Sequence, residues 1–446
     1  MNWDWSLDGW IVATGMLCAI ASALLGNFLV LRKMSMLGDA VSHAILPGIA
    51  IAFFVTQSRS SLPMFAGAAI AGVLTAMFTE WIKRFGRVDE SASMGVVFTS
   101  LFAAGLVMVV QAADKVDLDA GCVLYGAIEL TPNDQIALLG FEMPRAFCVL
   151  LVVAIVNAVF VAMFYKELKI TSFDAATADS MGISSRKMHY SLMVLVAVTA
   201  VAGFESVGNI LVVAMFIVPP STAYLLTRRL HTMILLSVCI AIASAVSGHL
   251  MAIHAPRWFG YGSTSTAGMM ATMSGVLFSL AFLFSPEQGL IVQIWQRFSM
   301  SLGILSDDIV ALLYRVEERG GTSELYPETV TKTLLRKELF SSRWLLALAL
   351  WRLVANREIQ LANDRPTLLD AGRLRAMKLV RSHRLWEQYL VTESVAGADR
   401  IHQSAEKLEH FTDRQLRDRL DESMDGPRVD PHGTVIPSER GPSNGS

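Results

Sequence analysis

Residues 8–31 read DGWIVATGMLCAIASALLGNFLVL, and no charged side chain follows Asp8 before Arg32. A hydrocarbon layer of about 30 Å is crossed by about 20 helical residues, so this stretch predicts a membrane-spanning helix. The first ten residues contain two aspartates and no Lys or Arg, whereas a cleavable signal peptide begins with a basic segment. We therefore expect residues 8–31 to remain in the protein as its first span.

Further apolar runs of similar length follow over the first 290 residues. The composition agrees, because 53% of the 446 residues are hydrophobic and only 17% are charged, which is unusual for a soluble protein. Around Glu205 and Gly208 the sequence fits either a tight turn or a break within one long segment, so eight and nine spans both stay open. The runs lie near 8–31, 38–57, 63–82, 91–112, 145–165, 190–204, 206–227, 231–253 and 267–290.

Lys and Arg residues predict the orientation, because they accumulate in cytoplasmic loops. Basic clusters occur in every second connection. Nine spans with the N-terminus outside and the C-terminus inside place all the clusters in the cytoplasm, whereas eight spans would place one of them outside. The sequence therefore predicts a multi-pass protein of the cell (inner) membrane. The clusters are Arg32/Lys33, Lys83/Arg84/Arg87, Lys166/Lys169/Arg186/Lys187 and Arg228/Arg229.

The chain changes character after residue 300. The last 146 residues hold 21 of the 37 Lys and Arg residues and 22 of the 39 Asp and Glu residues, and their apolar residues follow helical spacing. A mainly helical, water-soluble domain is expected there, on the cytoplasmic side. Residues 438–446 are polar and rich in Gly, Pro and Ser, and they are predicted to be a disordered tail.

Several functions are disfavoured by what the sequence lacks. A net charge of −2 gives the whole chain no electrostatic attraction to nucleic acid. The four cysteines have no CxxC spacing, so they indicate neither a disulfide framework nor a zinc cluster. Because no GxxxxGK[ST] pattern occurs, we expect ATP to be hydrolysed by a separate subunit and the chain itself not to be an enzyme.

The connection at residues 170–186 has the sequence of a short ordered helix. Asp174 is a favourable N-terminal cap, and Gly182 is a favourable residue just beyond the C-terminal end. Small residues between them, such as Ala178, are expected to form a flat outward face. Such a helix suits docking into a groove on a partner protein.

Four blocks follow one another in the apolar part: LVLRKMSMLGDAVSHAILPG (29–48), LYGAI (124–128), the loop at 174–182, and VGNILVVAMFIVPPSTA (207–223). Together they resemble the permease subunits of manganese, zinc and iron ABC uptake systems, the ABC-3 family, over nearly all of residues 10–295. The resemblance implies a permease dimer, formed with a second copy or a paralogue. It also implies a cytosolic ABC ATPase dimer and an extracytoplasmic metal-binding protein as partners, with the loop as the coupling helix that receives the ATPase movement.

Asp39 and His43 stand four residues apart, so they share one helical face. An intramembrane carboxylate beside an imidazole suggests a transient site for a divalent cation. Asp39 also lies near a predicted helix start, so capping is an open alternative. Glu205, at an outer turn, fits a cation acceptor and a solvated turn residue about equally, whereas His249 is expected on a solvated outer face.

The C-terminal part contains the densest set of metal-ligand residue types. His402, Glu406, Glu409 and His410 follow at i, i+4, i+7 and i+8, which places them on one helical stripe. A second pair, His383 and Glu387, stands four residues apart upstream. These imidazole and carboxylate groups suit a first-row divalent ion.

The segments RSHRLWE (381–387), HQSAEKLEH (402–410) and DPHGTVIP (430–437) resemble the metal-binding and dimerisation domain of the diphtheria toxin repressor and manganese-dependent repressor family. The resemblance covers about 306–437 and adds Asp308 as an N-terminal acidic ligand. Where manganese-type members have a second carboxylate, this chain has Ala311. The implied regulatory ligands are Asp308, His383, Glu387, His402, Glu406, Glu409 and His410.

The resemblance also bears on the metal and on DNA. Manganese-type repressors have a carboxylate where Glu406 stands and iron-type ones have cysteine, and a hard oxygen favours Mn²⁺, with Zn²⁺ or Fe²⁺ as alternatives. Residues 331–384 are basic, as a winged helix would need. However, the segment at 343–353 lacks the polar side chains that read base edges, so DNA binding is disfavoured. Attraction to the anionic lipids of the inner leaflet explains the charge more simply.

The sequence thus predicts an all-α polytopic membrane protein, N-out and C-in, with a mainly α, winged-helix-like plus helical metal-binding cytoplasmic domain. The expected function is that of a permease subunit in an ATP-driven importer of divalent metal ions, most of all manganese. Its tail is expected to sense metal or to stabilise the dimer. The alternatives are a zinc or iron importer, a membrane-anchored metal-responsive regulator, and, less favoured, a permease for an organic iron chelate or cobalamin. The predicted domains are 1–300 (transmembrane), 301–375 (winged-helix-like), 376–437 (metal-binding) and 438–446 (disordered).

Overall fold

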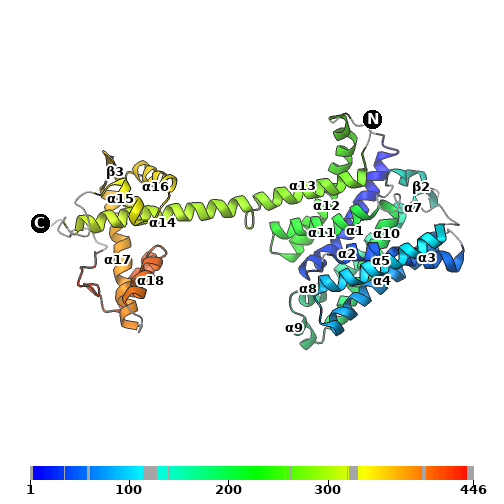
Figure 1. The fold of residues 1–446 in the computed structure, drawn as a ribbon, viewed down its shortest axis with the longest axis horizontal. Coiled ribbons are helices and arrows are strands. Elements are labelled where there is room, and N and C mark those ends of the chain that lie inside the picture. The colour runs from blue at the N-terminus through cyan, green and yellow to red at the C-terminus, as the bar shows by residue number, and fades with distance from the viewer. Residues whose placement is uncertain are drawn as a thin grey trace. The chain divides into compact units, whose positions relative to one another are not determined.

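Figure 1 shows the fold of the chain in a computed structural model. The chain forms two compact units, Met1–Gln293 and Ile294–Ser446, and each is described by itself. The residues that the structure describes are 4–34, 36–57, 61–113, 128–138, 141–258, 260, 264–318, 320, 330–393 and 398–438.

Helices make up almost all of the described part of the first unit. A short antiparallel hairpin precedes α7, with Gln135 opposite Pro144 and Leu138 opposite Phe141. The elements are α1 (Asp8–Leu31), α2 (Leu37–His43), α3 (Ile45–Thr56), α4 (Ser61–Gly86), α5 (Glu90–Ala113), η1 (Ile128–Asn133), β1 (Gln135–Leu138), β2 (Phe141–Pro144), α7 (Arg145–Met163), α8 (Tyr165–Phe173), α9 (Ala175–Ser180), α10 (Ser185–Val207), α11 (Asn209–Leu226), α12 (Leu230–Trp258) and α13 (Thr266–Phe284).

Nine stretches of the described chain are long and apolar enough to cross a membrane. They confirm the predicted nine-span helical architecture. Between the sixth and seventh, α10 and α11 are separate helices joined through Gly208 alone, whose φ of 93° lies in the region that favours glycine. The stretches are Asp8–Leu31, Leu37–Thr56, Pro63–Lys83, Ser91–Met108, Arg145–Met163, Ser185–Val207, Asn209–Leu226, Leu230–Trp258 and Thr266–Phe284.

Helix α1 occupies the centre of this bundle, in contact with α7, α10, α11 and α12 (Figure 1). Its small residues let the neighbouring backbones approach closely. A Cβ atom on Gly26 would lie 2.2 Å from the carbonyl oxygen of Phe216 on α11. Helix association in lipid depends on such close packing, because lipid tails are as apolar as the side chains and supply no hydrophobic drive.

Two buried asparagines fix neighbouring helices to α1. Asn27 of α1 donates to the hydroxyl of Ser237 on α12 at 2.7 Å. Asn157 of α7 donates to the carbonyl oxygen of Ala21 at 3.1 Å and to the hydroxyl of Thr199 on α10 at 2.9 Å. Polar groups between spans pair with one another because the bilayer core contains no water to satisfy them.

The second span is broken. Helix α2 ends at His43, the chain turns at Ala44, and α3 begins at Ile45. Pro47 explains the break, because it has no N–H to donate to the carbonyl of His43 and its ring would clash with that carbonyl in a continuous helix. Beyond the break, a Cβ on Gly48 would lie 2.3 Å from the carbonyl oxygen of Gly67 on α4, so α3 and α4 pack backbone to backbone.

The second unit combines helices with one hairpin. Helix α14 (Leu290–Glu318) runs across the boundary between the units. Its C-terminal half, α15, α16 and the β3–β4 hairpin share a core that includes Leu305, Ile309, Leu335 and Leu350. The remaining elements are α15 (Lys332–Glu338), α16 (Arg343–Ala355), β3 (Ile359–Ala362), β4 (Arg365–Leu368), α17 (Asp370–Glu393), α18 (Ala398–Glu409) and α19 (Arg414–Ser423).

The order of three helices and a hairpin is that of a winged helix, as predicted. The turn of the hairpin has positive φ at both Asn363 (50°) and Asp364 (64°), which matches the two-residue turn that the strand twist favours. Helix α17 then continues without interruption through residues 375 and 376, where the sequence predicts a domain boundary. That finer division of the C-terminal part stays a prediction, and most of the predicted tail at 438–446 lies outside the described residues.

Candidate functional sites

Asp39 and His43 lie side by side at the end of α2. The Nε2 atom of His43 is 3.4 Å from Oδ1 of Asp39. The imidazole packs against Phe98 and Phe102 of α5, with ring centroids 5.7 Å apart in both cases. The aromatic rings orient the imidazole, and the interruption of the second span follows directly after His43. An oxygen and a nitrogen donor therefore meet where the span is interrupted.

Capping by Asp39 is not seen. The residue that caps α2 is Met36, and no side chain accepts a capping hydrogen bond there. Asp39 instead occupies the first turn, where its charge complements the helix dipole. A ligand role for Asp39 and His43 in transport stays a proposal.

Two ionisable groups on other helices, Glu205 and His249, have partners. Glu205, near the end of α10, lies 3.7 Å from Nη2 of Arg145 at the start of α7. A cation at Glu205 would therefore meet a neighbouring arginine. The expectation that His249 is solvated was wrong: the residue is buried on α12, and its Nε2 atom is 3.1 Å from Oδ1 of Asp8.

The short helix predicted in the connection at 170–186 is present as α9, and its role as a coupling helix stays a proposal. The backbone N–H of Thr177 donates to the carboxylate of Asp174 at 3.0 Å, and Gly182 follows the helix with a φ of 81°. Both capping predictions are thus confirmed. The position of Ala178 corrects the expected outward face: it is fully buried because α9 packs through this residue onto its own bundle, and Ala175 and Ala176 are the exposed small residues.

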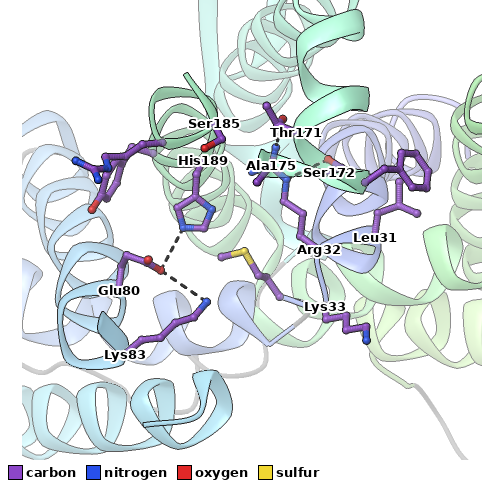
Figure 2. Close-up of a pocket in the computed structure, with 14 residues that line it drawn as sticks. Leu31, Arg32, Lys33, Glu80, Lys83, Thr171, Ser172, Ala175, Ser185 and His189 are labelled. Atoms are coloured by element: carbon purple, nitrogen blue, oxygen red, sulfur yellow. Dashed lines mark hydrogen bonds and ion pairs between the residues drawn. The ribbon is translucent and has the colours of Figure 1, made fainter. Parts of the chain in front are cut away.

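A pocket of about 650 Å³ opens beside α9 (Figure 2). Arg32 donates from its guanidinium to the hydroxyls of Thr171 at 2.8 Å and Ser172 at 3.1 Å. On another wall, Glu80 lies 3.3 Å from His189. Three of the four basic loop clusters thereby meet at one end of the bundle. The basic residues of the lining are Arg32, Lys33, Lys83 and Arg186.

In the second unit, His383, Glu387 and His402 form one potential metal-binding group. Oε1 of Glu387 lies 2.6 Å from Nδ1 of His402 and 3.2 Å from Nε2 of His383. Burial alone would lower the pKa of His383, but the carboxylates of Glu387 and Glu409 outweigh it and raise that pKa. Burial would raise the pKa of Glu387, but hydrogen bonds from both histidines lower it to about 2. Helices α17 and α18 bring this group together.

Asp308, Glu409 and His410 form a second potential metal-binding group. Nε2 of His410 lies 3.3 Å from Oδ1 of Asp308, and its Nδ1 lies 3.5 Å from Oδ2 of Asp307. Burial would lower the pKa of His410, but hydrogen bonds to Asp307 and Asp308 raise it to about 10. This group joins α14 to the end of α18. Ala311, one turn beyond Asp308, is buried and offers no ligand.

Glu409 connects the two groups. Its Oε2 atom is 2.6 Å from Nδ1 of His383, and Arg315 approaches the same atom at 3.7 Å. Within the described part of the chain, neither Oε2 of Glu409 nor Nδ1 of His383 has an aligned hydrogen bond, although both atoms are buried. Buried donors and acceptors are normally paired, so such convergence requires an explanation. Nitrogen and oxygen atoms that converge without hydrogen bonds fit the coordination of a metal ion.

The remaining predicted ligand, Glu406, is placed differently. It is exposed on α18 and belongs to neither group. Sequence reasoning overlooked Asp307, which contacts His410 and also pairs with Arg375 at 2.6 Å. The acidic pair Asp307-Asp308 was the available signal, but the family resemblance pointed to Asp308 alone.

The fold and these sites define a polytopic helical membrane protein that carries a repressor-like C-terminal part. The model of the ABC 3 transport family matches residues 8–285, and the model of the iron dependent repressor, metal binding and dimerisation domain matches residues 369–438. Because the first match covers more than half of the chain, the chain belongs to the ABC 3 transport family. Both resemblances inferred from the sequence are confirmed.

Individual relatives agree with this assignment. The manganese transport system membrane protein MntD of Bacillus subtilis is 44% identical over 65% of this chain and 95% of its own length. The zinc transport system membrane protein TroD of Treponema pallidum is 35% identical over 75% of this chain and 88% of its own length. Among solved structures, PsaBC from Streptococcus pneumoniae in complex with Fab shares 29% identity and a TM-score of 0.52, covering 63% of this chain and 92% of that one.

Proposed function

We propose that this chain is the permease subunit of an ATP-driven importer of divalent transition-metal ions. Manganese is the favoured substrate, and zinc or iron are the alternatives. Membership of the ABC 3 transport family and the names of the manganese and zinc relatives support this proposal. The observation that carries it is the Asp39–His43 pair at the interruption of the second span.

The pair has the chemistry of a site for transient binding. One carboxylate and one imidazole can replace part of the water around a first-row divalent ion. A resident structural metal usually has four protein ligands, so two ligands favour passage over retention. At the break, Pro47 leaves the carbonyl of His43 without its usual helical donor. Side-chain and backbone donors thus lie at one level of the span.

The partners follow from the position of α9. We assign α9, with Ala175 and Ala176 outward, as the contact for a cytosolic ATPase dimer. The adjacent basic pocket around Arg32 and Arg186 supports a cytoplasmic position for this end, because basic residues accumulate there. The C-terminus is then cytoplasmic as well. A second permease copy or a paralogue and an extracytoplasmic metal-binding protein complete the importer.

The second unit is proposed to sense internal metal. The six residues of the two groups would hold one or two ions, which would supply positive charge between opposing carboxylates. His383 and Glu409 position the groups next to each other. In this proposal the metal-loaded tail inhibits uptake or stabilises the permease dimer. A role in DNA binding is not proposed.

Metal uptake tests the pathway. Cells without their own importers would express the chain with its ATPase and binding protein, and the uptake of Mn²⁺, Zn²⁺ and Fe²⁺ would be compared. We expect Asp39→Asn and His43→Gln to reduce uptake by about tenfold or more. The matched control is Thr99→Ala, because this hydroxyl donates to Gly95 of its own helix. Wild-type uptake by both pathway variants, with normal ATPase assembly, would reject the site.

Co-purification separates the importer from the alternative of a membrane-anchored regulator. A permease should retain its ATPase subunit when purified in mild detergent. Substitution of Ala175 and Ala176 by glutamate should remove the ATPase, since these exposed positions lie on α9, without changing membrane insertion. If the chain regulates metal-responsive genes but binds no ATPase, the regulator interpretation replaces the permease.

A further inference from the structure

Helix α16 presents apolar side chains on both of its faces. One face, with Leu346, Ala349, Leu350 and Leu353, is buried in the core of the second unit. The opposite face is exposed, yet it is equally apolar. Its exposed residues between positions 344 and 355 are Trp344, Ala347, Leu348, Trp351, Val354 and Ala355.

The exposed face carries unusually large side chains. Trp344 is 88% exposed and Trp351 is 69% exposed. Phe340, in the turn before the helix, is 96% exposed and has a φ of 45°, a conformation that is uncommon for an aromatic residue. A helix that is apolar all round is normally covered, and an extended apolar patch on a soluble domain marks an interaction site.

A groove of about 710 Å³ adjoins this face between α15, α16 and β3. Its floor is apolar, and Lys332, Arg336 and Arg343 stand among its lining residues. From residue 331 to residue 356 the chain has five Lys and Arg residues but only one acidic residue, Glu338. The surface therefore combines exposed tryptophans, an apolar groove and a positive rim.

We infer that the exposed face of α16 with its basic groove is a docking site for an anionic phospholipid surface. Tryptophan prefers the interface between water and hydrocarbon. Helices that lie in this interface combine an apolar face with flanking Lys and Arg residues, which attract anionic headgroups. Charge complementarity thus selects a negatively charged bilayer.

Covalent attachment to the membrane-spanning helices also favours a bilayer as the occupant of this surface. The last candidate span ends at Phe284, so a bilayer is held at high effective concentration near every later segment. In a winged helix the corresponding helix would have to read base edges. Here the exposed positions of α16 from 344 to 355 carry no hydrogen-bonding side chain other than the tryptophan N–H groups, and Arg343 at the helix start is the one exposed charged residue. The inference does not depend on which ion the first unit transports.

Depth-sensitive fluorescence on the full chain tests the inference. The four cysteines would be replaced, and Trp344→Cys would carry an environment-sensitive fluorophore. The chain would be reconstituted in phosphatidylcholine vesicles with or without phosphatidylglycerol, with lipid-attached spin-label quenchers. We expect the label to shift to the blue and to be quenched in the anionic vesicles, and high salt should weaken both effects. The matched control is Asp418→Cys on α19, an exposed position that should stay in water.

A charge-reversed variant, Arg336→Glu with Arg343→Glu, tests the positive rim. The ratio of docked to undocked label should fall by about tenfold or more. An unchanged signal from position 418 shows that the variant folds. A label at 344 that remains in water in anionic vesicles would overturn the inference. A label that shifts to the blue but escapes the lipid quenchers would also overturn it, because the face would then be covered by protein or by a second copy.

Discussion

The chain contains two kinds of histidine–carboxylate site, and they differ in the way they are held. In the membrane unit, Asp39 and His43 are half-exposed neighbours at a broken helix. In the second unit, six potential ligand residues on or next to three helices gather in two connected groups, and Glu409 at their junction is buried. The first arrangement suits an ion that must leave again. The second arrangement suits an ion that stays bound long enough for the protein to sense it.

The largest expected effect is a loss of metal affinity when Glu409 is substituted. It would distinguish the site in the second unit from the Asp39–His43 pair. Glu409→Gln removes the charge that both tail groups share but keeps the shape of the side chain. We expect metal affinity of the full chain to fall by at least about 100-fold at the tail. Isothermal titration of the purified protein would measure it.

Glu406→Gln is the matched control for Glu409→Gln. It changes the same residue type on the same helix, but at an exposed position outside both groups. Equal losses in the two variants would show that Glu406 is a ligand and that the arrangement of α18 changes when metal binds.

Substitution at the helix break should affect the membrane site alone. Gly48→Val forces side-chain atoms into the space next to the carbonyl of Gly67, where even an added Cβ would lie only 2.3 Å from the carbonyl oxygen. Overpacking of this kind costs about 1–3 kcal/mol. Thermal unfolding should show a less stable membrane unit and unchanged metal binding by the tail. Gly95→Ala is the control, because a Cβ there meets nothing within 4 Å.

Proton release should accompany metal binding at the tail. The pKa of His410 is raised to about 10, so this imidazole is protonated at neutral pH in the metal-free protein. A metal ion must displace that proton, and affinity should therefore fall as the pH falls, by up to about tenfold per pH unit. Titration in buffers of different ionisation heat counts the protons. Binding without proton release would exclude His410 as a ligand.

The same shift predicts how the metal-free tail responds to alkali. The folded-state pKa of His410 lies above the value of about 6.5 for an unfolded chain. Its contribution to stability is therefore fully present below about pH 6.5 and is lost as the pH rises through about 10. Unfolding by denaturant from pH 6 to pH 10 would show the loss, and His410→Gln should remove this pH dependence.

The smallest expected effect concerns α9, the proposed coupling helix. Asp174→Ala removes the hydrogen bond from the backbone N–H of Thr177, and the loss of such a cap costs about 1 kcal/mol. Metal-stimulated ATP hydrolysis should decrease moderately, while metal binding by the tail is unchanged. Asp174→Asn should retain most of the activity, because asparagine caps about as well. Equal losses in both variants would contradict a capping role.

Much of the local structure followed from residue type. Asp174 and Gly182 mark the two ends of α9 because capping depends on a few neighbouring residues. The direction in which Ala178 points could not be predicted, because the outer and inner faces of a short helix are set by the elements packed on it. For the same reason, His249 was expected in water but pairs with Asp8 across two helices.

For the predicted ligands of the second unit, helical periodicity was likewise informative only in part. The spacing from His402 to His410 correctly predicted a shared helix, but a stripe on a helix cannot tell which member faces a partner. His383 of α17 contacts Glu409. Asp307 and Asp308 of α14 contact His410. Glu406 lies on the exposed side of the same helix.

By itself the sequence determined the class of solvent for each part, the apolar runs that form the spans and the types of candidate ligand, because burial in lipid and coordination chemistry depend on composition and short-range spacing. Only the tertiary structure decided that Glu409 joins two groups, that Arg145 faces Glu205 and that the outer face of α16 is left uncovered. These features depend on contacts between segments far apart in the chain, and no local pattern specifies them.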